Sequence, residues 1–386
     1  MKRFSNLEPG QVRLVYWNNV PTPYMDERFA CIKNLLGDNF AAAYTLKGAK
    51  SHGWKIGSPR YQVIHSGATA PSLANDATLI LKILKYRPTH VVALHAERVA
   101  PLLALLGRFL GFYVIFWTVT TFDTWIKRSK AKEWAKRFVF RLGSGVVSPG
   151  ADGIAYARKY HRQVAAAVVP HSIDLVHFAS PQMPGFRRAA RRAILTNNQA
   201  NGTIFLYVGR IIRDKGLFEM ASGFSRSSAA GSGTLVFVGD GKDQEELRQY
   251  CSNMGIDTRF DRFQQRADLL DFYALADYFV FPTLGDPYGL VIDEALQGGC
   301  PVLTSPAAGE LRGRISDGFN GRIAEGTGSD AWRDLFDAIT KSPIPRHNKS
   351  LLPRPIAPLD YATRLLSALQ EVGPLAGPSS ASETER

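Results

Sequence analysis

Short apolar runs recur along the chain, and most are followed by a turn and then by apolar residues spaced as on one face of a helix. These runs are Val12 to Trp17, His90 to Leu94, Tyr113 to Val119, Gly145 to Val147, Ile204 to Val208, Thr234 to Val238, Tyr278 to Pro282 and Pro301 to Thr304. Runs that are continuously apolar are typical of parallel strands that are buried on both faces. The pattern predicts an α/β chain of two Rossmann-like units in series.

Proline, glycine and arginine interrupt this pattern after Phe178, which is typical of a linker. Further interruptions follow, with five prolines between residues 343 and 358 and a tail rich in Pro, Gly, Ser and Glu. We therefore predict an N-terminal domain over 1–178, a linker over 179–200 and a second domain over 201–345. A segment with a helix, which could cross back to the first domain, is predicted over 346–373, and a disordered tail over 374–386.

The composition fits a globular, cytoplasmic protein. The 386 residues are enough for two domains, and 45% are hydrophobic against 21% charged. The residues after Met1 hold no secretory signal, and charged residues break the apolar region from Val91 to Trp117 before it reaches the length of a membrane span. Three cysteines without a C-x-x-C pair favour reduced thiols over disulfides or zinc ligands.

The positive charge is concentrated in the first half. Residues 1–180 hold 24 Lys and Arg against 10 Asp and Glu, a net +14, whereas residues 181–386 hold 23 against 24. Residues 127–142 alone hold seven basic residues and Glu133, with apolar residues at helical spacing. This segment predicts either a helix packed on the sheet with a solvated basic side or a contact with an anionic membrane.

The strongest chemical pattern lies between Asp286 and Glu294. It follows a predicted strand, and Pro287 and Gly289 allow a sharp turn into a helix. The first amides of that helix, over Gly289, Leu290 and Val291, have no partner within the helix and favour a phosphate. Glu294, about one turn further, suits the two hydroxyls of a ribose, and Asp286 suits the hydroxyls of a sugar. The alternative is an ordinary turn from strand to helix, in which Asp286 caps the helix and Glu294 faces solvent.

Two basic residues follow the strand at Phe205 to Val208. Arg210 and Lys215 lie in the loop and helix start after this strand, where two cations can neutralise a diphosphate. They could equally be exposed residues of a surface loop. The later Gly239-Asp-Gly241 turn lacks the third glycine of a dinucleotide fingerprint, and close packing of a turn explains it as well as a ligand does.

These motifs together resemble the GT-B glycosyltransferases of family 4. The resemblance rests on Val208 to Gly216, on Gly239 to Gly241, on Asp286 with Glu294, and on Val169 to Phe178 at the exit from the first domain. It implies two Rossmann-like domains with parallel sheets facing across a cleft. Arg210 and Lys215 would then bind the diphosphate, Glu294 the ribose and Asp286 the sugar. The chain has Asp286 where the family usually has Glu, and His171-Ser172 where it has Asn-Gly.

In the N-terminal half, the resemblance places the Tyr16 to Tyr24 loop over the donor phosphates. It also makes His95, which follows a predicted strand, a contact near the reacting carbon. The alternatives are that the Tyr16 to Tyr24 loop is a turn shaped by its prolines without a ligand, and that His95 has a structural role. No D-x-D pair occurs in the sequence, so no metal or other cofactor is expected and the cations would stabilise the leaving phosphate. Asp123 and His95 are the candidates for a catalytic base.

The expected function is a retaining, metal-independent hexosyltransferase that moves a sugar from a UDP- or GDP-linked donor to a saccharide or lipid-linked saccharide. The setting suggested by the resemblance is bacterial surface polysaccharide or lipopolysaccharide synthesis, at the inner face of the cytoplasmic membrane. The alternatives are a sugar-nucleotide epimerase or a phosphorylase of the same fold, and a non-catalytic protein that binds anions or nucleic acid. Nucleic acid is not an expected partner, because no nucleic-acid module is evident.

Overall fold

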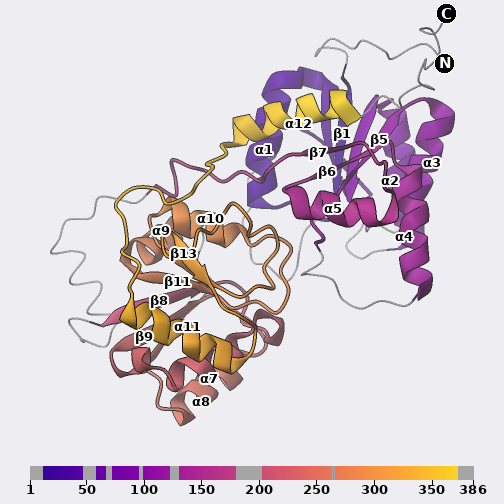
Figure 1. Ribbon diagram of the computed structural model, residues 1–386. Helices are drawn as coiled ribbons and strands as arrows, with labels where there is room; N and C mark the ends of the chain where they lie inside the picture. The colour runs from indigo at the N-terminus through magenta and orange to yellow at the C-terminus, as the bar shows by residue number, and fades with distance from the viewer. Residues whose placement is uncertain are drawn as a thin grey trace, which may run out of the picture. The chain divides into compact units, whose positions relative to one another are not determined.

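The computed structural model describes residues 12–46, 58–66, 72–94, 99–121, 130–179, 202–262, 264 and 266–372. These residues form two compact units, shown in Figure 1. The first unit holds the described residues up to Val119, those from 130 to Pro170 and those from Pro358 onward, and the second holds Thr120, Thr121 and His171 to Ala357. Most of the predicted linker and the whole predicted tail lie outside the described residues.

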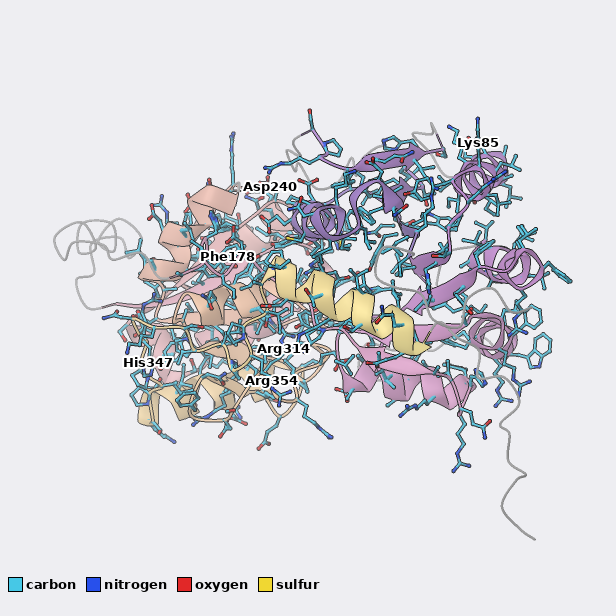
Figure 2. All side chains as sticks on the ribbon, turned by 90° about the horizontal axis from the view of Figure 1, so that it is seen from above. Lys85, Phe178, Asp240, Arg314, His347 and Arg354 are labelled. Atoms are coloured by element: carbon cyan, nitrogen blue, oxygen red, sulfur yellow. The ribbon has the colours of Figure 1, made fainter. Side chains whose placement is uncertain are left out.

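The division between the units falls at Pro170 and His171, earlier than the predicted boundary at residue 178. Ile173 and Phe178 explain the difference, because both are buried in the core of the second unit. Figure 2 shows Phe178 among the side chains of that unit. The backbone amide of Ile173 also donates to the carbonyl of Ile356 at 3.2 Å. Residues 171–178 are therefore the first residues of the second unit.

The first unit is a parallel sheet of seven strands in the order β3-β2-β1-β4-β5-β6-β7. Its elements are β1 (Leu14–Asn18), α1 (Pro23–Leu36), β2 (Phe40–Tyr44), β3 (Gln62–His65), α2 (Leu73–Lys85), β4 (His90–Leu94), α3 (Ala100–Leu110), β5 (Tyr113–Trp117), α4 (Lys130–Leu142), β6 (Gly145–Ser148), α5 (Ala151–Tyr160), β7 (Ala166–Val168) and α12 (Pro358–Val372). Successive strand residues alternate between the two faces. One face packs against α2, α3, α4 and α5.

The other face of this sheet packs against α1 and α12. Tyr361 of α12 is fully buried, and its hydroxyl lies 3.3 Å from that of Tyr16 in β1. The guanidinium of Arg28 in α1 lies 4.8 Å from the centre of the Tyr361 ring. Figure 1 shows α12 in yellow beside α1, although some 320 residues separate them in the sequence, counted from Leu36 to Pro358. The last described helix therefore completes the first unit.

The second unit is a parallel sheet of six strands in the order β10-β9-β8-β11-β12-β13. Its elements are β8 (Thr203–Val208), α7 (Leu217–Ser225), β9 (Gly233–Val238), α8 (Gln244–Asn253), β10 (Thr258–Asp261), α9 (Arg266–Leu275), β11 (Tyr278–Phe281), α10 (Leu290–Gln297), β12 (Val302–Thr304), β13 (Gly321–Ile323) and α11 (Ser329–Lys341). One face carries α7, α8 and α11, and the other carries α9 and α10. The prediction of two Rossmann-like units is confirmed.

His90, at the start of β4, gives the first unit a predicted pH dependence. It is 3% exposed, and burial lowers the pKa of its imidazole from 6.5 to about 4. Between these values the folded protein keeps the imidazole neutral while the unfolded chain binds a proton, so stability falls as the pH falls. We expect this group to lower the free energy of unfolding by roughly 2 kcal/mol between pH 7 and pH 5.

Urea unfolding at the two pH values measures this contribution. A His90→Gln variant cannot bind the proton and should lose that part of the pH dependence. His347→Gln, at an exposed position, should keep it. Equal pH dependence in both variants would show that His90 is not the responsible group.

Candidate functional site

The order of strands in the second unit places a ligand site between β8 and β11. The chain adds β9 and β10 on one side of β8, then β11, β12 and β13 on the other. In an open parallel sheet, ligands bind at the carboxyl ends of the strands where the order reverses in this way. The loop after β8 carries Arg210 and Lys215, and the loop after β11 carries Asp286. The three predicted polar residues therefore lie at one edge of one sheet.

Lys215 and Asp286 connect these two loops directly. The Lys215 ammonium donates to Oδ2 of Asp286 at 2.6 Å, and the side chains are 14% and 21% exposed. Lys215 ends a short 3-10 helix, Arg213–Lys215, and the backbone amide of Leu284 donates to the carbonyl of Asp214 at 3.1 Å. Because the pair is largely shielded from solvent, its position is better defined than that of an exposed ion pair.

Arg210 lies in the same loop as Lys215, and a buried tyrosine contacts its backbone. The hydroxyl of Tyr207 donates to the Arg210 carbonyl at 2.8 Å. Burial raises the pKa of Tyr207 far above its ordinary value, the Asp286 carboxylate raises it further, and the Arg210 guanidinium lowers it. The Arg210 side chain itself is exposed. Tyr207 was not predicted as a site residue, because in the sequence it is one apolar residue of a buried strand.

Asp286 begins the turn that leads into α10. Its Oδ1 accepts from the amide of Tyr288 at 3.1 Å, and its backbone pairs with residues 307–309 in the loop after β12. Gly289 has φ +68°, and a Cβ there would lie 2.7 Å from the Phe281 ring, so a side chain is excluded. Within the described part of the chain, the amides of Gly289, Leu290 and Val291 have no hydrogen bond. Amides in this position can bind an anion, and the predicted role toward a phosphate stays a prediction.

Glu294 lies in α10, four residues after its first residue, and is fully buried. Its Oε2 accepts a hydrogen bond from the Tyr273 hydroxyl of α9 at 2.8 Å. The alternative of a solvent-facing Glu is therefore wrong, since this carboxylate lies inside the unit. A carboxylate oxygen can accept more than one hydrogen bond. Tyr273 is a second contact that the sequence did not reveal.

Arg314 lies in the loop after β12 and stabilises the turn that precedes α10. Figure 2 labels this residue, which is 8% exposed. Its guanidinium donates to the carbonyls of Tyr288 and Gly289 at 2.6 and 3.0 Å and pairs with Asp293 at 2.9 Å. The Asp293 carboxylate raises the pKa of Arg314, which keeps the guanidinium charged despite burial. These contacts fix the two residues that precede α10.

The Gly239-Asp-Gly241 turn after β9 packs on the neighbouring loop. A Cβ at Gly239 would lie 2.0 Å from the carbonyl oxygen of Gly209, and a Cβ at Gly241 would lie 1.9 Å from that of Ile211. The amide of Ile211 also donates to the Asp240 carbonyl at 3.0 Å. The close approach of the two loops is sufficient to require both glycines, so no ligand is needed to explain them.

In the first unit, the corresponding reversal of strand order lies between β1 and β4. Asn18 ends β1 and Asn19 follows it, and their carbonyls accept from the amides of Thr45 and Leu46 after β2. Thr22 then caps α1 through its hydroxyl, which accepts from the Met25 amide at 3.3 Å. His95 and Asp123 lie outside the described residues. The contacts of this loop thus fix its backbone, and its predicted role toward a donor stays a prediction.

No group of three or more His, Cys, Asp or Glu side chains among the described residues is arranged to hold a metal ion. In the same residues, no helix has the length and apolar character needed to cross a membrane.

The arrangement of the chain matches known structures over nearly its full length. It aligns with the crystal structure of Alr3699/HepE from Anabaena in complex with UDP and glucose, with a TM-score of 0.66 and 16% identity, covering 94% of this chain and 96% of that one. The chain has the GT-B fold. At this level of identity the likeness establishes the fold of both units.

Sequence comparison adds a match that lies mostly within the second unit. Residues 191–350 match the family described as glycosyl transferases group 1. A D-inositol 3-phosphate glycosyltransferase of Kribbella flavida is 31% identical over 188 residues, which are 46% of this chain and 43% of that protein. An Escherichia coli UDP-Gal:alpha-D-GlcNAc-diphosphoundecaprenol alpha-1,3-galactosyltransferase is 22% identical over 71% of this chain and 74% of its own length. The chain thus spans less than half of the Kribbella relative.

Proposed function

We propose that this GT-B protein is a glycosyltransferase that transfers a hexose from a UDP- or GDP-linked donor to a saccharide acceptor, with retention of configuration. The observation that carries the proposal is the Lys215–Asp286 pair at the β8–β11 switch point, beside the three amides at the start of α10 that have no hydrogen bond within the described part of the chain. Cations and free amides suit a diphosphate, and a carboxylate suits sugar hydroxyls. Relatives named as glycosyltransferases support the reaction class.

In this proposal each residue has one task. Arg210 and Lys215 bind the diphosphate with the amides of Gly289, Leu290 and Val291, and they stabilise the charge that develops as the sugar leaves. Asp286 binds hydroxyls of the transferred sugar, and Glu294 binds those of the ribose. His95 contacts the donor near the reacting carbon. Charge stabilisation by these side chains and amides requires no metal ion, so we propose metal independence.

The acceptor is proposed to be a lipid-linked or lipopolysaccharide-type saccharide, bound by the first unit. The E. coli relative is named for an acceptor of the diphosphoundecaprenol type, which supports this class.

The first unit also offers a surface that suits an anionic membrane: Phe109 of α3 and Trp134 of α4 are 79% and 69% exposed, on a unit rich in basic residues. Flotation with phosphatidylglycerol vesicles tests this contact, since a Phe109→Ser, Trp134→Ser double variant should bind them less than the unaltered protein does.

Thermal unfolding with a panel of UDP, GDP, ADP and their sugars tests the donor site. The correct nucleotide at 100 times its dissociation constant should stabilise the protein by about 2.7 kcal/mol. Glu294→Gln keeps the shape of the side chain but loses its charge, and should remove most of this stabilisation. The matched control is Glu325→Gln, at an exposed position, which should keep it. Stabilisation that is equal in the two variants would exclude Glu294 from the donor site.

Product analysis separates this function from its alternatives of the same fold. A glycosyltransferase gives a glycosylated acceptor and a nucleoside diphosphate. An epimerase would give an epimeric sugar without acceptor, and a phosphorylase would cleave a saccharide only when phosphate is added. Either of these results, with no transfer to any saccharide, would overturn the proposal.

A further inference from the structure

A basic cavity lies in the first unit, on the side of the sheet that carries α4 and α5. Its volume is about 400 Å³. The side chains that line it include Arg137 and Arg141 from α4, Lys159 and Tyr160 from α5, and His161 and Arg162 from the segment that follows. Figure 1 shows α4 and α5 as neighbouring helices of this unit. The lining contains four fixed positive charges and an imidazole, and no carboxylate.

Three of the four positive charges at this cavity have no carboxylate partner among the described residues. Within the described part of the chain, Arg137, Arg141 and Arg162 form no ion pair with a carboxylate. Clustered like charges repel one another, and an anion between them removes that cost. The guanidinium of Arg141 is also not required to cap α4. Arg108 of α3 does so, donating to the carbonyls of Arg141 and Leu142 at 2.5 and 3.1 Å.

The wall of the cavity is rigid and adds one more positive charge. Tyr160 is 6% exposed, and its ring stacks on that of Phe140 with centroids 5.8 Å apart. The Lys136 ammonium is buried behind it, 5.2 Å from the centre of the Tyr160 ring, and donates to the hydroxyl of Tyr156. The Nδ1 atom of His161 is shielded from solvent and has no hydrogen-bond partner among the described residues. A packed wall with exposed arginines around it suits a small, highly charged ligand.

The cavity is separate from the carboxyl edge of the sheet, where the first unit was predicted to meet a donor. Arg137 and Arg141 precede β6, and residues 159–162 precede β7, so the lining lies where these strands begin. In a parallel sheet the strand beginnings and the strand ends lie at opposite edges, and β4 ends at the edge away from this cavity. The cavity is therefore a second site within the unit.

We propose that this cavity binds a phosphate group. Arginine side chains bind phosphate oxygens through paired hydrogen bonds, and the cavity brings three of them together with a lysine. The group comes either from the headgroup of an anionic phospholipid or from a soluble phosphate compound. Both present the same oxygens to the same side chains. The site does not depend on the function proposed for Lys215 and Asp286.

Calorimetric titration with inorganic phosphate, against sodium chloride of equal ionic strength, tests the site. An Arg141→Gln, Arg162→Gln double variant should bind phosphate about tenfold or more weakly than the unaltered protein. The control is an Arg60→Gln, Arg158→Gln double variant, which removes the same charge from exposed positions outside the cavity lining and should keep the affinity. Lys215→Met should also keep it, which separates this site from the donor site.

Binding to phosphatidylglycerol and phosphatidylcholine vesicles identifies the source of the phosphate. If the cavity variant loses binding to phosphatidylglycerol and the control variant does not, the ligand is a lipid headgroup. If both variants bind these vesicles equally while the cavity variant alone loses inorganic phosphate, the ligand is a soluble phosphate compound. Equal phosphate affinity in the two double variants, or no saturable binding to the unaltered protein, would overturn the proposal.

Discussion

Replacing Arg314 by methionine should lower the free energy of unfolding by about 3–5 kcal/mol, the loss typical of breaking a buried ion pair by removing one partner. The change leaves the Asp293 carboxylate, which is 4% exposed, without this cation, and it leaves the carbonyls of Tyr288 and Gly289 without their donor. Methionine fills much of the same volume, so the loss reports mainly on charge and hydrogen bonds. Urea unfolding followed by circular dichroism measures it.

Two further variants make this measurement specific. Arg312→Met, at an exposed position two residues away, should change stability by less than about 0.5 kcal/mol. An Asp293→Leu, Arg314→Met double variant removes both charges and should recover part of the loss, because no unpaired charge stays buried. If Arg314→Met costs no more than Arg312→Met, the buried pair does not stabilise the turn before α10.

Replacing Lys215 by methionine should lower kcat/KM for sugar transfer by about 10²–10³-fold, the range found when one stabilising donor is removed from a reacting centre. Methionine keeps the unbranched chain over the Phe281 ring, which lies 5.8 Å from the ammonium, and removes only the charge. The Asp286 partner is 21% exposed and can be solvated by water. Stability should therefore change much less than activity.

Steady-state kinetics and a thermal unfolding curve on the same sample separate the two effects. Lys215→Arg keeps the charge but not the compact ammonium, and should retain more activity than Lys215→Met. Lys341→Met, at the exposed end of α11, controls for the loss of one positive charge and should leave kcat/KM unchanged. A Lys215→Met enzyme with the full rate would exclude Lys215 from the stabilisation of the leaving diphosphate.

The eight strands that the sequence predicted are all present, and five others among the described residues were missed for identifiable reasons. Four of the missed strands, β3, β7, β10 and β13, are the edges of the two sheets. An edge strand is covered on fewer sides, so it needs no continuous apolar run; no residue of β10, for example, is fully buried. The fifth, β2, is buried but has the sequence Phe-Ala-Ala-Ala-Tyr, and alanine has low strand propensity.

The site was predictable to the extent that its residues follow strands. Lys215 and Asp286 are 71 positions apart, yet both come after buried runs, and parallel strands bring their carboxyl ends to one edge. The residues that hold the site in place carry no such signal. Tyr273 reaches Glu294 from the last turn of a different helix, and Arg314 reaches α10 from a loop. Their roles depend on how elements pack, which a spacing pattern does not encode.

The position of α12 has a consequence for the order in which the protein is made. The described residues of the second unit lie between His171 and Ala357, apart from Thr120 and Thr121, whereas the first unit needs a helix that begins at Pro358. During synthesis, the ribosome therefore releases the whole second unit before it releases the helix that covers Tyr16 and Arg28. The first unit is therefore completed only after the second, and until then the part of its sheet that α12 covers remains exposed to solvent.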